Sequence, residues 1–260
     1  MPCVFCGNAK LSNEHVWPRW LARAAPGPQQ SLRVFRRRTE QAGGTQAQDE
    51  WPAPPYTIKV RAVCRRCNHG WMSELEQEVR PLMEPMLHGQ SRILDRDRQK
   101  LLALWAFKTA TMLEFVYPQE RAIQLSDAAW VYEHREPPPR AIVWIASYRG
   151  TARNSFYRHD VMQPGTGALA DQVEREHDAP IPPPVAYGAN FGVRHVAFQV
   201  FGTTQDNHSF GHRRWVAAAF AKIWPPQAAI TWPPLTALDD RTLPQVLELF
   251  ATADMKGPFD

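Results

Sequence analysis

Long apolar runs are missing from this 260-residue sequence. No stretch approaches the roughly 18 consecutive apolar residues that a membrane-spanning helix needs, so no membrane partner is expected. The first residues, Met1 to Cys6, also lack a basic segment followed by an apolar one, which argues against secretion. The sequence therefore predicts a protein of the cytoplasm.

Cysteine is scarce, and its arrangement is informative. The four cysteines form two Cys-x-x-Cys pairs, Cys3 with Cys6 and Cys64 with Cys67, and none is left over. Disulfides rarely persist in a reducing cytoplasm, whereas two such pairs supply the four thiolates of a tetrahedral metal site. The spacing predicts one structural Zn²⁺ ion. A redox role is the alternative, but it would explain only one of the two pairs.

The net charge of +4 is small and unevenly distributed. Residues 1–92 contain 13 Lys/Arg and 8 Asp/Glu, so the rest of the chain has a slight negative excess. The basic side chains gather in two stretches, which are Arg33, Arg36, Arg37 and Arg38, and then Lys59, Arg61, Arg65 and Arg66. Such stretches attract a phosphate backbone. A solvated basic face is the alternative interpretation.

The first third of the chain predicts a small metal-stapled unit. Residues 3–7 are expected to form a tight zinc knuckle, in which Gly7 permits the turn. The expected elements that follow are an extended segment over 11–17, a helix over 18–23, a strand over 57–63, the second knuckle, and a helix over 71–80 that ends at Pro81. Residues 24–56, rich in Pro, Gly and Gln, are interpreted as a loop insertion with one basic strand over 32–38.

The rest of the chain predicts a mixture of helices and strands. The expected elements are helices over 95–116, 126–134 and 244–253, and strands over 140–148, 155–162 and 191–201. Residues 163–188 are expected to be loop. The fold class is therefore α+β, with a zinc-stapled module over residues 1–92 and an α+β accessory region over residues 93–260. The accessory region is expected to select the substrate or to mediate assembly.

Three chemically useful residues lie beside the two cysteine pairs. Glu14 and His15 follow the first pair, and Asn68 comes directly after Cys67. A zinc ion that joins the pairs would bring Asn68 close to Glu14 and His15. Carboxylate and amide oxygens suit a hard divalent cation, and an imidazole can accept a proton near neutral pH. This set is sufficient for metal-assisted hydrolysis of a phosphodiester bond.

The same residues carry a resemblance to a known family. Cys3-x-x-Cys6, Glu14-His15-Val16-x-Pro18 and Cys64-Arg65-Arg66-Cys67-Asn68 together resemble the zinc-containing branch of the HNH endonucleases, which have the ββα-metal or His-Me finger fold. The resemblance covers about residues 1–88. It implies an endonuclease that acts on nucleic acid, with DNA expected, and leaves 5′-phosphate and 3′-hydroxyl ends.

The resemblance also implies a role for each site residue. His15 would be the general base, Glu14 and Asn68 would hold one catalytic Mg²⁺ or Mn²⁺ ion, and the four cysteines would hold a separate structural zinc. The residues expected to contact nucleic acid are Arg36, Arg37, Arg38, Lys59, Arg61, Arg65, Arg66 and His69.

Two positions depart from the family pattern. The family has a middle Asn shortly before the second knuckle, but Tyr56 to Val63 contains none, and Glu14 stands where Asp is commoner. A second interpretation is therefore a catalytically inactive, zinc-stapled module that binds nucleic acid or protein, with His15 as a buried structural residue. The acidic series Glu74, Glu76 and Glu78 is interpreted as solvating its helix.

Overall fold

The structure is a computed structural model of the chain. It describes residues 1–25, 33–36, 48–50, 55–116, 121, 123–151, 155–162, 186–203, 209–212, 214–247 and 253–256. Helices and strands are both well represented, which confirms the prediction of a mixed helix-and-strand fold. Among the described helices, none has the length and apolar character needed to cross a membrane.

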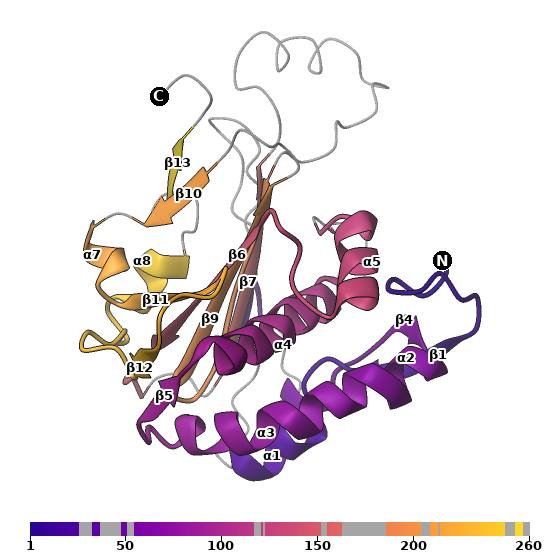
Figure 1. The fold of residues 1–260 in the computed structure, drawn as a ribbon, viewed down its shortest axis with the longest axis horizontal. Helices are drawn as coiled ribbons and strands as arrows, with labels where there is room; N and C mark the ends of the chain where they lie inside the picture. The colour runs from indigo at the N-terminus through magenta and orange to yellow at the C-terminus, as the bar shows by residue number, and fades with distance from the viewer. Residues whose placement is uncertain are drawn as a thin grey trace, which may run out of the picture.

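A seven-stranded sheet forms the centre of the described part of the chain (Figure 1). Its strand order is β11-β6-β9-β8-β7-β2-β3, and every neighbouring pair is antiparallel except the parallel pair β2 and β7. The strands are β2 Arg33–Arg36, β3 Gln48–Glu50, β6 Ala141–Ser147, β7 Ser155–Met162, β8 Ala186–Val193, β9 Val196–Thr203 and β11 Phe220–Trp224.

The sheet is covered on both faces. Every residue of β8 and β9 is buried, which is the pattern of strands at the centre of a sheet with two covered faces. One face packs against helix α4, Arg96–Glu114. The other packs against α7, Arg214–Ala217, and α8, Leu243–Leu247, through a second buried cluster.

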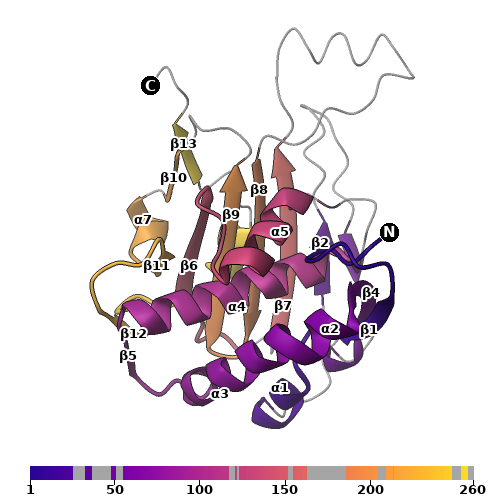
Figure 2. The same cartoon turned by 45° about the vertical axis from the view of Figure 1, so that its right-hand side comes forward.

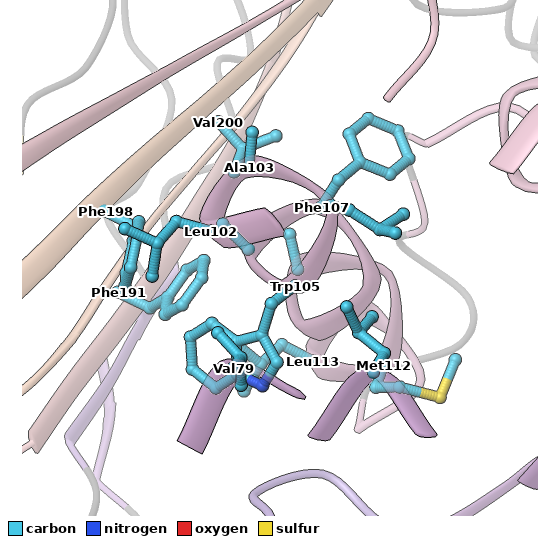
Figure 3. Close-up of a cluster of buried hydrophobic side chains, with 14 of the residues drawn as sticks. Val79, Leu102, Ala103, Trp105, Phe107, Met112, Leu113, Phe191, Phe198 and Val200 are labelled. Carbon is cyan, nitrogen blue, oxygen red and sulfur yellow. The ribbon is translucent and has the colours of Figure 1, made fainter. Parts of the chain in front are cut away.

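Three further helices lie on the side of α4 that faces away from the sheet or beside α4 (Figure 2). Helix α4 crosses the strands, α3 (Ser73–Leu87) packs on α4, and α1 (Arg19–Ala24) packs on α3. Helix α5, Leu125–His134, contacts α4 beside it. The core between α4 and the sheet contains Trp105, whose ring centroid lies 6.2 Å from that of Phe191 and 5.6 Å from that of Phe198 (Figure 3).

The N-terminal elements include a two-stranded antiparallel sheet followed by a helix. Strand β1, Leu11–His15, pairs antiparallel with β4, Lys59–Cys64. The chain then continues through α2, Arg65–Cys67, and a π-helical turn, η2, Asn68–Met72, into α3. The 3₁₀ turn η1, Pro55–Thr57, precedes β4. The remaining strands are β5 Arg92–Leu94, which pairs with β12 Ile230–Trp232, and β10 Ser209–His212, which pairs with β13 Ala253–Lys256.

Most expected elements of the second half are confirmed, with α4, α5, β6 and β7 at the predicted places. The single strand expected over 191–201 is wrong, because β8 and β9 are two strands joined at Arg194 and His195. Arg194 has a positive φ of 49°, a conformation that two-residue hairpin turns require and that Gly or Asn usually supplies. The turn therefore carried no recognisable sequence signal.

Two expected helix ends are also wrong. Helix α3 does not stop at Pro81 but continues through Pro81 and Pro85 to Leu87. A proline inside a helix removes a backbone hydrogen bond, but the buried face of α3 packs against α4 and supports the element. At the C-terminus, the helix expected over 244–253 is confirmed only as α8, since Ala253 already belongs to β13 and residues 248–252 lie outside the described part.

The two predicted halves share a sheet and a core. Strand β2 lies within the predicted insertion, yet it pairs with β7 of the predicted accessory region. The larger buried cluster likewise extends from Cys3 to Trp232. The division at residue 92 remains a prediction about the chain, and the residues on its two sides are packed together.

Candidate functional site

The four cysteines meet in space. Their sulfur atoms all lie within 4.8 Å of one another, with 3.8 Å between Cys3 and Cys67 and 3.5 Å between Cys6 and Cys64. Four sulfurs around a tetrahedral zinc with Zn–S bonds of about 2.3 Å would be about 3.8 Å apart. The donor set and its spacing therefore fit a Zn²⁺ ion.

The backbone holds the two cysteine pairs against each other. Gly7, with a φ of 73°, closes the first knuckle and donates its N–H to the carbonyl of Cys3 at 2.9 Å. Val4 donates its N–H to the carbonyl of Ala62 in β4 at 2.9 Å, so the first knuckle is tied to the strand that ends at Cys64. Cys67 follows within one helical turn.

The neighbouring thiols also shift one another's pKa values. The hydrogen bond with Cys67 lowers the pKa of the Cys3 thiol, and the same contact raises the pKa of Cys67. Burial raises the pKa of Cys6. Such opposed shifts are expected where neighbouring thiols compete for protons that a bound metal would displace.

Glu14 and His15 lie at the end of β1, where the pairing with β4 is irregular. Ser12 is opposite Val63, but Glu14 is opposite Val60, so β4 contains one extra residue between these pairs. Bulges of this kind change the direction of nearby side chains. Glu14 is buried at 8% exposure, whereas His15 is only partly buried.

Asn68 connects the start of the helical segment to this strand. Its side-chain nitrogen donates to the hydroxyl of Ser12 and to the backbone carbonyl of Asn13, both at 3.2 Å. The Asn68 side chain also acts on the neighbouring Glu14 carboxyl, whose pKa it lowers. Asn68 begins the π-helical turn η2, which is interrupted at Gly70. The structure thus places Asn68 against the strand that carries Glu14.

Burial dominates the electrostatics of Glu14. It raises the pKa of the carboxyl to about 7, and the negative charge of Glu76 acts in the same direction. The Lys108 ammonium opposes this shift, as do the hydrogen bonds from the His15 backbone and the Asn68 side chain. Glu14 therefore lies within a buried network of charges.

Lys108 and Glu76 are site residues that sequence reasoning missed. Lys108 of α4 is fully buried, and its ammonium nitrogen lies 2.8 Å from a carboxylate oxygen of Glu76 in α3. The interpretation of Glu76 as a solvating side chain is therefore wrong. The available signal was a lysine inside the apolar part of the helix predicted over 95–116, because a buried lysine requires an acidic partner.

His15 opens onto a pocket of about 610 Å³. The pocket is lined by His15, Arg19, Ala22, Arg23, Tyr56, Thr57 and Lys59. Burial lowers the pKa of His15, and the positive charges of Arg19 and Lys59 lower it further, so the neutral imidazole is favoured. The neutral imidazole, which can accept a proton, is thus the dominant form near neutral pH.

The predicted nucleic-acid contacts are dispersed. Lys59 lines the pocket, whereas Arg61, Arg65, Arg66 and His69 are exposed residues outside its lining. Arg36 lies in β2, where only the backbone is described, and residues 37 and 38 lie outside the described part. Arg19 and Arg23 were not among the predicted contacts, although Arg-x-x-x-Arg spacing places both on one face of a helix.

The described residues contain one cluster of three or more Cys, His, Asp or Glu ligands, and it is the cysteine cluster. A cation beside Glu14 would take a single protein carboxylate there, together with oxygens from Asn68, water or substrate. Mg²⁺ is commonly held in this way, by one or two carboxylates, waters and phosphate oxygens. The residues are therefore compatible with such an ion.

Comparisons with known proteins do not place the chain in a family. No family model matches it, and neither a curated protein nor a solved structure shows significant similarity.

Proposed function

We propose that this chain is a metal-dependent endonuclease of the HNH kind, which hydrolyses phosphodiester bonds of nucleic acid, with DNA as the first substrate to test. The observation that carries the proposal is the pair of hydrogen bonds from Asn68 to β1 directly beside Glu14, next to a His15 that opens onto a basic pocket. The order of strand, strand and helix through β1, β4 and α3 supports it, since that order is expected of a ββα-metal site.

The four cysteines are assigned to structural zinc. They join the first knuckle, the end of β4 and the start of the helical segment, which are the three places that position Glu14, His15 and Asn68. Structural zinc sites are closed tetrahedra of four protein ligands, so this ion has no role in chemistry. Its function is to hold the β1–β4 sheet against the helical segment that starts at α2.

In this proposal, His15 accepts a proton from the water that attacks the phosphorus atom. Its place on an open pocket gives both water and a phosphodiester access to the imidazole. Glu14 and the side-chain carbonyl oxygen of Asn68 would hold Mg²⁺ or Mn²⁺, because the Asn68 nitrogen is already bonded to β1. The bound ion supplies neutralisation of the negative charge that develops on the phosphate and leaving oxygens.

The missing middle Asn has a local substitute. Ser12 donates its hydroxyl to the carbonyl of Val63 at 3.1 Å, and Asn68 donates to Ser12 and Asn13. These bonds connect the end of β1 to β4 and to the helix start. Positioning of the segment before Glu14 therefore does not require an Asn between Tyr56 and Val63.

A second candidate function is a zinc-stapled binding module without catalysis. The observation that favours it is Lys108, since a buried ammonium already balances Glu14 and Glu76 when no divalent cation is bound. In such a module the cysteines and basic side chains would keep their roles, and His15 would be structural.

Cleavage of supercoiled plasmid separates the two candidates. Purified protein with Mg²⁺ or Mn²⁺ should nick the plasmid, and His15→Ala should slow nicking about 10²–10⁴-fold, the usual contribution of a general base. His88→Ala is the matched control, because His88 is an exposed residue at the end of α3. Near-native nicking by His15→Ala would reject the assignment of the base. No nicking by a folded, zinc-containing wild-type protein would favour the binding module.

A further inference from the structure

The pocket beside His15 contains three positive side chains and no acidic one. Arg19, Arg23 and Lys59 all line it, and its other lining residues are neutral or, for His15, favour the neutral form. Within the described part of the chain, no carboxylate forms an ion pair with any of the three. Their charges are therefore available to a ligand.

The local structure places these charges around the imidazole. His15 and Lys59 are directly opposite each other in the β1–β4 ladder. Helix α1 buries Trp20, Leu21 and Ala24, so its other face, with Arg19 and Arg23, is turned outward. Arg19 and Arg23 are four residues apart and thus neighbours on that face.

This arrangement is unfavourable unless an anion is present. Two arginines at positions i and i+4 repel each other and weaken a helix that has only six residues. Arg19, Arg23 and Lys59 line the same pocket, so their charges act on the same small volume. A concave surface with several like charges concentrates the field and attracts the opposite charge.

We propose that Arg19, Arg23 and Lys59 form a phosphate-binding site that holds the nucleic-acid backbone next to His15. Guanidinium groups bind phosphate oxygens in a bidentate manner, and lysine adds a point charge. The pocket has room for a backbone phosphate together with its sugar. The identification of this backbone as the strand to be cut rests on the proposed function, whereas phosphate binding by the pocket does not.

The site differs from the contacts expected from the sequence. Arg65 and Arg66 lie in α2 beside the cysteine cluster, and neither lines the pocket with His15. Arg19 and Arg23 instead come from α1, which contacts η1 and shares the pocket with Lys59 at the start of β4. Phosphate contacts set the register of a bound strand. The pocket cations are therefore the ones that align a strand with His15.

Binding can be measured separately from cleavage. The probe is a short fluorescein-labelled DNA duplex and its single strand, titrated by fluorescence anisotropy against His15→Ala protein without added divalent ions. Adding Arg19→Ala, Arg23→Ala or Lys59→Ala should each weaken binding several-fold. Each should also reduce the slope of log K against log salt by about 1 for the duplex. Lys100→Ala is the control, since it removes an equal charge from an exposed site on α4.

The outcomes are distinct from those of the cleavage test. A weaker DNA affinity and a smaller salt slope in the three pocket variants, but not in Lys100→Ala, would support the site, even when the wild-type protein cuts nothing. Pocket variants that bind like Lys100→Ala would overturn it, even when the wild-type protein cuts DNA. Inorganic phosphate, added at constant ionic strength, tests the source of the ligand. Displacement of the DNA by phosphate would indicate a site for a single phosphate group. DNA that stays bound would indicate that the protein holds several backbone phosphates.

Discussion

Lys108 carries its charge inside the protein, between helices that are separate in the chain. Its ammonium group contacts Glu76 at 2.8 Å, and its charge lowers the pKa of the buried Glu14 carboxyl. Removing one member of a buried ion pair costs more than removing both, because the remaining charge loses its partner and stays away from water. Lys108 thus connects the packing of α3 and α4 to the candidate site.

Lys108→Met should destabilise the protein by about 2–3 kcal/mol, at the lower end for a buried pair because Glu76 is partly exposed. The double variant Lys108→Met/Glu76→Gln should recover most of this loss, since no unpaired charge remains in the pair. Urea unfolding followed by circular dichroism measures both free energies. Equal destabilisation of the single and the double variant would contradict the pairing.

His212 gives the protein a dependence on pH away from the candidate site. Burial lowers the pKa of its imidazole from 6.5 to about 4. The ring lies tilted against those of Trp144 and Phe220 and hydrogen-bonds Gln199. Below pH 6.5 the unfolded chain binds a proton at this residue that the folded chain does not bind. The stability that His212 contributes is therefore complete above pH 6.5 and is lost as the pH falls toward 4.

The expected loss at pH 5 relative to pH 7 is about 2 kcal/mol of unfolding free energy from this residue. His212→Gln cannot titrate, so its stability should fall by that much less over the same interval. Urea titrations of both proteins at the two pH values supply the comparison, and other ionisable groups cancel in the difference. Parallel losses in the two proteins would rule out His212 as the source.

At the scale of elements, we expect the β1–β4 sheet and the one-turn helix α2 to depend on the cysteine cluster. This sheet has only two strands, and within the described residues no further strand pairs with it. Two-stranded hairpins are marginally stable alone. A metal that binds only the folded arrangement adds its binding energy to that of folding.

Cys64→Ser should therefore lose the zinc and loosen these elements first. We expect metal content to fall from about one zinc per chain to near zero, because three thiolates leave the tetrahedral site open. Elemental analysis measures the metal, and hydrogen exchange measures protection of β1 and β4. Ser73→Ala, at the partly buried start of α3, is a suitable control for substitution nearby. Full zinc occupancy in Cys64→Ser would contradict the four-cysteine site.

At the scale of the whole molecule, one buried cluster links the β1–β4 sheet to the central sheet. It contains Cys3 and Cys67 beside the candidate metal and also Trp105 and Phe198 between α4 and the sheet. A continuous core favours cooperative unfolding, in which distant parts lose structure together. The predicted division at residue 92 would instead allow two steps.

Trp105→Ala should destabilise the protein by about 3–5 kcal/mol, since it removes a fully buried ring from that core. Zinc release and loss of the helical circular dichroism signal should shift together to lower urea, because both depend on the same cluster. Trp130→Ala serves as the control, as Trp130 is partly buried on α5 and should cost less. Zinc release that keeps its wild-type midpoint in Trp105→Ala would indicate two independent units.

Local patterns were sufficient for the expected cysteine cluster and for several elements. The two Cys-x-x-Cys pairs are close together, as their number and spacing predict. The helix α4 and the strands β6 and β7 follow from periodicity. These features depend on ligand chemistry and on side-chain spacing within one segment, which the sequence contains.

The sequence by itself therefore determined which four cysteines can bind a metal and where several of the regular segments lie. The tertiary structure alone decided that Lys108 faces Glu76 and Glu14, that Arg19 and Arg23 share a pocket with His15, and that β2 joins the central sheet. Each of these contacts joins residues far apart in the chain or depends on how an element is oriented in space. Their free energy comes from packing and charge between elements, which no local pattern records.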